Sequence, residues 1–292
     1  MAALPPSTAR RAALAQVARQ RPDFPLEDFV RSYPEYLEAE ARLLKAVPVE
    51  LSMMDAVCRR RMSQGHEPQW LFIYKPPDVR ITKVGDPLFE GEWTLLDWVR
   101  ERLGAYACPA CESTARLCHQ LDFATSGVIL VANCYIADRL GSSAFNKREV
   151  EKEYLAIVKG TAKRQTLQGW VSAGAADPFR TSPAAGYQDA QTAVIPVKTG
   201  ILRPPSGRSG SELLCTLVKL MPATGRRHQL RILLAASGHP IVGDDSYGGN
   251  WCWEGLPVGR MYLHSSLVGL TRAGLSIAEC RHDDDFGIKS IK

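Results

Sequence analysis

The sequence predicts an α+β fold in which strands dominate from about residue 67 onward. The aromatic and β-branched run at 70–74 is typical of a strand, and Pro76 and Pro77 end it. The wholly apolar run at 128–132 is typical of a strand buried on both faces. Further strands are predicted at 151–159, 166–173, 190–198 and 212–221.

Helices are predicted at fewer places. Thr94 is expected to cap a helix over 94–100, because its hydroxyl is a good acceptor for the amides of a first helical turn. A second helix is expected over 135–145, and a third contains Arg231 and ends at Gly238. Residues 1–66 are also predicted to be helical, interrupted by prolines and glycine.

Three segments are predicted along the chain. Residues 1–22 contain four arginines and no acidic residue, which is typical of an organellar transit segment; the alternative is a basic N-terminal tail. Residues 23–66 are expected to form a helical extension, and residues 67–292 the main domain. A mitochondrial location is therefore expected, with a cytoplasmic or nuclear one as the alternative.

Composition narrows the class of protein. A hydrophobic content of 45% and a charged content of 23% are typical of globular proteins. No apolar run is long enough for a membrane helix, so no membrane partner is expected. The net charge of +5 favours a polyanionic partner only weakly. The eight cysteines lack a framework spacing, which predicts a reducing compartment. Cys108 and Cys111 have the spacing of half a zinc site, but no second pair matches them, so no metal site is predicted.

One carboxylate has a position that requires a partner. Asp122 lies in a polar turn directly before the apolar run at 128–132. A buried charge without a partner is costly, and an arginine can bind a carboxylate through two hydrogen bonds. The segment 225–231 supplies arginines at the start of a predicted helix. The alternative is an aspartate that only caps its own turn.

Six motifs, in this order along the chain, resemble those of the RluA-type RNA pseudouridine synthases. They are Phe-Ile-Tyr-Lys-Pro at 72–76, His-Gln-Leu-Asp-Phe-Ala-Thr-Ser-Gly at 119–127, Lys-Glu-Tyr at 152–154, Gly-Arg-Arg-His-Gln-Leu-Arg at 225–231, Gly-His-Pro-Ile-Val-Gly-Asp-Asp-Ser-Tyr-Gly at 238–248 and Tyr-Leu-His-Ser at 262–265. Each motif is weak alone, but together they cover about residues 70–280. The resemblance implies the pseudouridine synthase fold, a mixed, mostly antiparallel sheet with flanking helices and a central RNA-binding cleft.

The same resemblance implies an isomerase that breaks the bond between ribose and N1 of uracil, turns the base and rejoins it through carbon five. Such a redox-neutral reaction needs no cofactor, and the sequence has no nucleotide-cofactor fingerprint. Asp122 is then the catalytic carboxylate, as nucleophile or base. Arg231 is expected to pair with Asp122, and Tyr154 to stack on the uracil. The alternatives are a solvent-facing Arg231 and a core Tyr154.

Other residues of the motifs are candidates for substrate binding. Four are predicted to contact RNA phosphate, with an ordinary surface charge as the alternative for each: Lys75, Lys152, Arg226 and Arg227. Five more residues, from the motifs at 119–127 and 225–231, are predicted to bind substrate: His119, Gln120, Thr125, His228 and Gln229. His228 and Gln229 are also expected to brace the Arg231 helix, whereas Asp244 and Tyr247 are expected to shape a loop.

One position departs from the family pattern. Gln120 replaces an arginine that can fill the gap left by a flipped base, which favours an unpaired or loop uridine as substrate. The predicted partner is RNA, ribosomal RNA first and transfer RNA second, with ribosomal assembly intermediates as further partners. The alternative function is a synthase-like RNA-binding assembly factor whose catalysis is dispensable. A metal-dependent deaminase or nuclease would need clustered ligands that the sequence lacks.

Overall fold

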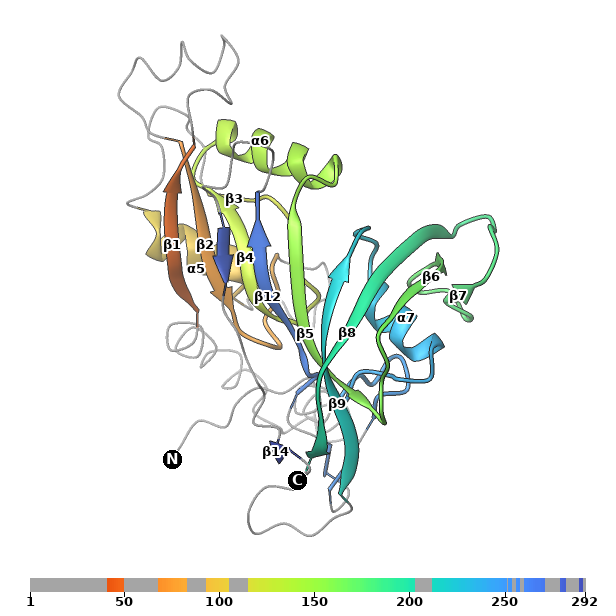
Figure 1. Cartoon of the computed structure of the whole chain (residues 1–292). Helices are drawn as coiled ribbons and strands as arrows, with labels where there is room; N and C mark the ends of the chain where they lie inside the picture. Colours follow the sequence, from red (N-terminus) through yellow and green to blue (C-terminus); the bar gives the residue numbers. More distant parts are fainter. Residues whose placement is uncertain are drawn as a thin grey trace, which may run out of the picture. The chain divides into compact units, whose positions relative to one another are not determined.

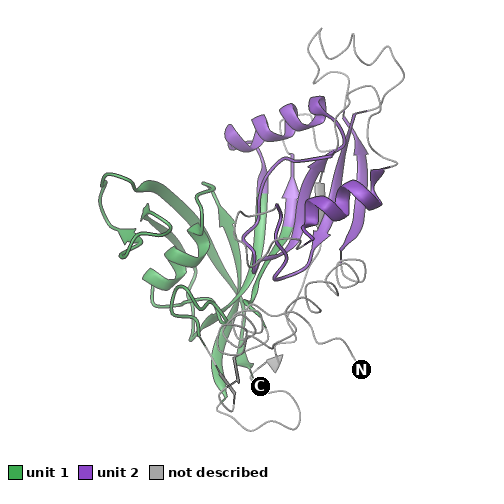
Figure 2. Cartoon of the chain, turned by 180° about the vertical axis from the view of Figure 1, so that it is seen from behind, with its two compact units in different colours: residues 1–11, 152–266, 283–292 green, residues 12–151, 267–282 purple. Residues whose placement is uncertain are grey.

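The computed structural model describes residues 41–49, 68–82, 93–104, 115–202, 212–250 and 260–270, and the backbone of short strands at 252–253, 256–257, 279–281 and 289–290. The chain divides into two compact units, coloured separately in Figure 2. Unit 1 is built around Lys152–Ser266, and unit 2 around Ala12–Glu151 with Leu267–His282. The boundary at Lys152 lies inside the predicted main domain.

The elements carry the labels of Figure 1. The strands are β1 (Arg42–Pro48), β2 (Gln69–Lys75), β3 (Arg116–Leu117), β4 (Ser126–Ala132), β5 (Glu151–Lys159), β6 (Gln165–Val171), β7 (Phe179–Arg180), β8 (Gln188–Leu202), β9 (Leu213–Pro222), β10 (Cys252–Trp253), β11 (Leu256–Pro257), β12 (Leu263–Gly269), β13 (Glu279–Arg281) and β14 (Lys289–Ser290). The helices are α5 (Leu95–Arg102), α6 (Tyr135–Asn146) and α7 (Gln229–Ala236).

Unit 2 contains a sheet with a wholly apolar centre. Strand β2 pairs antiparallel with β1 on one side and with β4 on the other, and β3 also pairs with β4. Every residue of β4 is buried. Helix α6 packs on this core through Ile136 and Ala137, and the indole Nε1 of Trp70 donates to the carbonyl of Ala137 at 3.0 Å. The strand that follows Asp122 is therefore part of a rigid core.

Unit 1 contains strands in the order β5-β9-β8-β6-β7, and each of these pairings is antiparallel. Strand β8 is long enough to pair with both β6 and β9, and its register with β9 shifts between Pro196 and Lys198. A bulge is a common place for a proline within a sheet. Helix α7 packs through Ile232 and Leu233 against Val171 and Ala190 of β6 and β8, which fixes the helix that carries Arg231.

The structure confirms the α+β class and most of the predicted elements. Thr94 caps α5 with both hydrogen bonds of a capping box, donated by the backbone N–H groups of Asp97 and Thr94. Strand β5 has the predicted bounds, whereas β8 extends beyond them at both ends. No described helix is long and apolar enough to span a bilayer.

The predicted N-terminal helical region is wrong over Arg42–Pro48, which is strand β1. This segment pairs with β2 from Arg42 opposite Tyr74 to Pro48 opposite Gln69, and Val47 enters the core beside Trp70. Pairing with a neighbouring strand has overridden the helical spacing of the leucines. Residues 1–40 and 50–67, with the rest of the predicted transit segment and helical extension, lie outside the described residues.

Candidate active site

Asp122 lies at the start of a tight turn in unit 2, residues 121–127, here called the Asp122 turn. Its carbonyl accepts a hydrogen bond from the backbone N–H of Thr125 at 3.1 Å, which closes the turn. The turn leads directly into β4. The carboxylate of Asp122 is half-buried. A reactive group in this place is accessible and yet attached to the core.

Lys75 holds the backbone of the Asp122 turn through hydrogen bonds from its ammonium group. Its side chain is completely buried at the end of β2, and Nζ donates to the carbonyls of Pro76 at 2.9 Å, Phe123 at 2.8 Å and Thr125 at 2.7 Å. A buried ammonium requires such acceptors. This arrangement gives Lys75 a structural role, and its predicted phosphate contact stays a prediction.

His119 connects the Asp122 turn to β4. Its Nε2 accepts a hydrogen bond from the backbone N–H of Leu130 at 2.9 Å, and its ring stacks on Phe145 of α6 at a centroid distance of 4.4 Å. Gln120, next to it, is exposed. The hydroxyl of Thr125 is buried and has no hydrogen-bond partner among the described residues. Substrate contact by these three residues stays a prediction.

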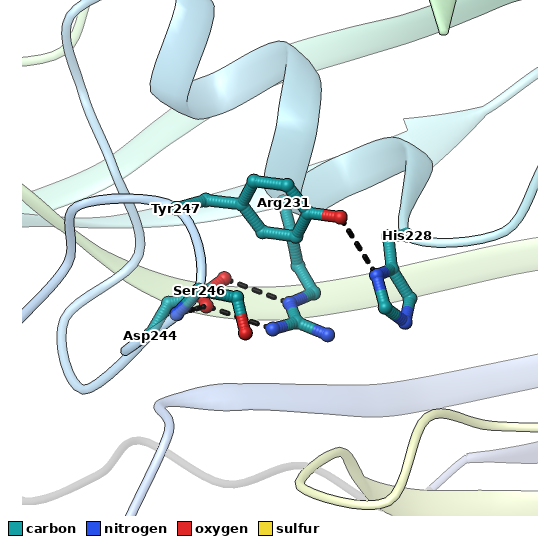
Figure 3. A network of polar contacts seen from close by, with 5 residues as sticks. All are labelled: His228, Arg231, Asp244, Ser246 and Tyr247. Carbon is teal, nitrogen blue, oxygen red and sulfur yellow. Dashed lines mark hydrogen bonds and ion pairs between the residues drawn. The ribbon is translucent and has the colours of Figure 1, made fainter. Parts of the chain in front are cut away.

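Arg231 has a carboxylate partner that the sequence analysis did not identify. On the buried side of α7 in unit 1, its Nε donates to Oδ2 of Asp244 at 2.7 Å and its Nη2 to Oδ1 at 2.8 Å (Figure 3). The ring of Tyr247 lies 4.9 Å from the guanidinium carbon. Arg231 is thus buried and paired, which contradicts the solvent-facing alternative. Its predicted pairing with Asp122 stays a prediction.

The loop that contains Asp244 depends on close backbone contacts. The N–H of Ser246 donates to Oδ1 of Asp244 at 3.1 Å, and the N–H of Gly249 donates to the Asp244 carbonyl at 2.8 Å. A Cβ at position 249 would lie 1.7 Å from the carbonyl oxygen of Ile241, so only glycine fits there. The glycines of the motif at 238–248 were a signal for this loop, although they did not reveal the ion pair.

Gln229 fixes the turn before α7, residues 224–228, here called the arginine turn. Its Nε2 donates to the carbonyl of Gln191 and to Thr192 Oγ1, both at 2.9 Å. Its Oε1 accepts from Thr224 Oγ1 at 2.6 Å and from the N–H of Arg226 at 3.0 Å. The side chain is buried and uses both donors and its acceptor. Gln229 thus braces the start of α7 against β8, and its substrate contact stays a prediction.

Three cationic side chains surround the arginine turn. Arg226 is half-buried and its Nε donates to the carbonyl of Asp189 at 3.1 Å, whereas Arg227 is exposed. Lys152, on the neighbouring strand β5, directs Nζ to the carbonyl of Thr224 at 3.3 Å. The three charges are therefore gathered on one surface, with Arg227 the most accessible to a polyanion.

Tyr154 is half-buried on β5, and the alternation of the strand places it on the same face as Lys152. The opposite face carries Glu153, which forms an ion pair with Lys219 at 2.7 Å. Partial exposure beside a cation suits an aromatic ring that stacks on a base. Tyr154 is therefore not fully buried. Its contact with uracil stays a prediction.

Within the described ranges, no three His, Cys, Asp or Glu side chains are grouped to bind one metal ion. Cys108 and Cys111, which have the spacing of half a zinc site, lie outside these ranges. Among the described residues, unit 2 contains a turn with one carboxylate, and unit 1 contains a buried arginine, an aromatic strand residue and a cationic turn.

Comparison with known proteins shows which family this chain resembles. A family described as RNA pseudouridylate synthase matches residues 69–236, a range that includes both Asp122 and Arg231. The chain is similar to RNA pseudouridylate synthase domain-containing protein 1 of Bos taurus, with 32% identity over 223 residues, 73% of this chain and 68% of that protein. It is also similar to dual-specificity RNA pseudouridine synthase RluA of Yersinia pestis, with 38% identity over 141 residues, 46% of this chain and 61% of that protein. Among solved structures, human RNA pseudouridylate synthase domain containing 1 aligns with a TM-score of 0.57 at 29% identity, covering 74% of this chain and 80% of that one.

Proposed function

This chain belongs to the RluA-type family of RNA pseudouridylate synthases, which are isomerases, and on that premise we propose that it converts uridine to pseudouridine in ribosomal RNA with Asp122 as the catalytic carboxylate. The observation that carries the proposal is the Asp122 turn. Its carboxylate is half-buried, Lys75 binds two carbonyls of the turn, and His119, just before the turn, binds the backbone of β4. A carboxylate on a rigid, partly exposed turn is oriented for reaction before substrate arrives.

In the proposed reaction the Asp122 carboxylate acts at the ribose, either as nucleophile at C1′ or as the base that starts elimination. The bond between C1′ and N1 breaks, and the uracil turns. A bond between C1′ and C5 forms, C5 loses its proton and N1 gains one. No electrons are gained or lost, so the reaction needs no cofactor. Arg231 is the predicted ion-pair partner of Asp122, and Tyr154 is predicted to stack on the turning base.

An RNA substrate is supported by the names of relatives and by the surface of unit 1; ribosomal RNA is the form of it that we propose. One relative is named a dual-specificity RNA pseudouridine synthase and another a tRNA pseudouridine synthase. Arg227, with Arg226 and Lys152 beside it, supplies positive charge for RNA phosphates. Gln120 in place of the family arginine favours a uridine in a loop. The arginine-rich residues 1–22 favour an organellar RNA.

A direct test uses purified protein with transcripts of ribosomal and transfer RNA that contain loop and duplex uridines. Pseudouridine is read at single positions by carbodiimide treatment and primer extension. We expect modification by the wild-type protein, none above background with Asp122→Asn, and wild-type yields with the exposed control Asp177→Asn. RNA affinity of Asp122→Asn should stay within a few-fold of wild type.

Two outcomes would contradict the proposal. Equal modification by wild type and Asp122→Asn would remove Asp122 from the chemistry. Tight RNA binding by a wild-type protein that modifies none of the transcripts would favour the alternative, an RNA-binding assembly factor. Modification of transfer RNA alone would support the proposed activity but show that the substrate is transfer RNA and not ribosomal RNA.

A further inference from the structure

Three residues surround the guanidinium of Arg231 in unit 1: Asp244, Tyr247 and His228, here called the Arg231 frame (Figure 3). Asp244 binds one edge of the guanidinium through Nε and Nη2, at 2.7 Å and 2.8 Å. A fork-to-fork pair of this kind fixes both the position and the plane of the group. It directs the third nitrogen, Nη1, away from Asp244.

Tyr247 covers a face of the same guanidinium, with its ring centroid 4.9 Å from the guanidinium carbon. The hydroxyl of Tyr247 lies 2.8 Å from Nδ1 of His228, and the two rings meet edge to face at 5.7 Å. This hydrogen bond prevents the phenol ring from turning off the guanidinium. The plane and the edge of Arg231 are therefore fixed by different residues.

The frame joins two segments that are distant in the sequence. His228 is the residue directly before α7 and has a left-handed backbone with φ of 55°. A non-glycine residue in this conformation is strained and needs support from its surroundings. Asp244 and Tyr247 belong to the loop closed by Gly249. The Tyr247–His228 hydrogen bond therefore connects the arginine turn to the loop that positions Arg231.

We propose that Asp244, Tyr247 and His228 are positioning residues for catalysis, a role that rests on the proposed function and goes beyond it. The frame fixes the plane and the direction of the Arg231 guanidinium, the group that the proposed function pairs with the reacting carboxylate. Asp244 sets the direction of the guanidinium, and the Tyr247–His228 pair prevents rotation out of plane. Loss of either should lower kcat much more than it raises KM, because the cationic side chains predicted to contact RNA phosphate, Lys152, Arg226 and Arg227, are unchanged.

The first comparison sets Asp244→Asn against Asp245→Asn. Both remove one negative charge at adjacent positions, but only the first breaks the bidentate contact with Arg231. We expect kcat of Asp244→Asn to fall about 100-fold, the usual cost of a misplacement near 1 Å, with KM within about threefold of wild type. Asp245→Asn should retain wild-type kcat. Equal effects of the two substitutions would reduce the role of Asp244 to its charge and overturn the proposal.

The second comparison removes a single oxygen, so the protein should fold even if Asp244→Asn does not. Tyr247→Phe keeps the ring on Arg231 and deletes the bond to His228, while His228→Gly deletes the other partner and keeps the left-handed backbone accessible. Each should lower kcat about 3–10-fold, and the double variant should match the single ones because they break the same bond. Independent, multiplying effects would contradict a shared frame.

A readout without catalysis separates this inference from the proposed function. Hydrogen exchange of the Arg231 Nε–H, followed by NMR, should be slow in wild type and in Asp122→Asn, and fast in Asp244→Asn. Slow exchange in a wild-type protein that makes no pseudouridine would support the Arg231 frame and contradict the proposed enzymatic function. Fast exchange in an active wild-type protein would contradict the Arg231 frame and support the proposed enzymatic function.

Discussion

Among single residues, Lys75 has a structural role that can be tested by a measurement of stability. Lys75→Met keeps the apolar stem but leaves the carbonyls of Phe123 and Thr125 without their donor. We expect a loss of about 3 kcal/mol or more in the free energy of unfolding, since each buried carbonyl left unsatisfied costs about 1–3 kcal/mol. Denaturant unfolding measures this loss. If Lys75→Met has wild-type stability and its RNA binding depends less on salt, Lys75 contacts RNA phosphate and does not stabilise the turn.

Arg227 provides the opposite case, because its side chain is exposed beside the arginine turn. Arg227→Gln should leave the melting temperature unchanged and weaken binding to all RNAs by a similar factor. The slope of log affinity against log salt should fall by about 1, the effect of losing one phosphate contact. Titrations at several salt concentrations measure the slope. An unchanged slope would make Arg227 an ordinary surface charge.

Asp245 gives a prediction about pH. Partial burial, and after it the negative charge of Asp244, raise the pKa of the Asp245 carboxyl above its ordinary value, while Arg231 opposes the shift. The folded protein therefore binds this proton more tightly than the unfolded chain, so stability is favoured at low pH and decreases as pH rises through the folded pKa. Asp245→Asn should melt higher than wild type at pH 7, and this gain should vanish below about pH 4. A gain that is constant with pH would exclude the carboxyl as its cause.

At the residue scale, the sequence motifs located Asp122 and Arg231 but not the contacts around them. The glycine-aspartate motif of residues 238–248 indicated a loop, and nothing in its spacing revealed that Asp244 would bind Arg231. The same holds for Lys75, whose charge suggested a surface and whose side chain is buried. Motifs give residue types in order, whereas burial and partners depend on segments that are distant in the chain.

Among the structural elements, the loop that ends at Gly249 has a position where only glycine fits. Gly249→Ala would place Cβ 1.7 Å from the Ile241 carbonyl oxygen, so the backbone that positions Asp244 must move. We expect a loss of about 2–3 kcal/mol in stability and a fall in kcat. Gly248→Ala is the matched control, since its Cβ meets open space and its left-handed backbone costs about 1–2 kcal/mol. Thermal melts and turnover of both variants measure the difference. A Gly249→Ala protein as active as Gly248→Ala would contradict the account of this loop.

The elements that could be predicted are those with strong local signals. The Thr94 capping box, the apolar run of β4 and the alternating run of β5 each specify one conformation. Strand β1 lacks such a signal, because its two adjacent leucines fit either period and its pairing with β2 decides the outcome. The length of β8 was also underestimated, since the strand continues through the register shift between Pro196 and Lys198 and still pairs with β9 as far as Leu202.

For the whole molecule, the motifs indicated the family and the α+β class but not the division into two units. Asp122 and Lys75 belong to unit 2, whereas Tyr154, Arg231 and the arginine turn belong to unit 1. In each unit the candidate residues lie on segments tied to that unit's own core. The proposed chemistry therefore requires both units, and activity of either one alone would be evidence against it.

The most direct test of the central claim is a map of pseudouridine in cellular RNA at single-nucleotide resolution. It compares cells without the protein, complemented with the wild-type chain, with Asp122→Asn or with the control Asp177→Asn. We predict that one or a few ribosomal RNA positions lose pseudouridine without the protein, regain it with wild type and Asp177→Asn, and remain uridine with Asp122→Asn. Restoration of every lost position by Asp122→Asn, or an unchanged map after deletion, would contradict an Asp122-dependent RNA pseudouridine synthase.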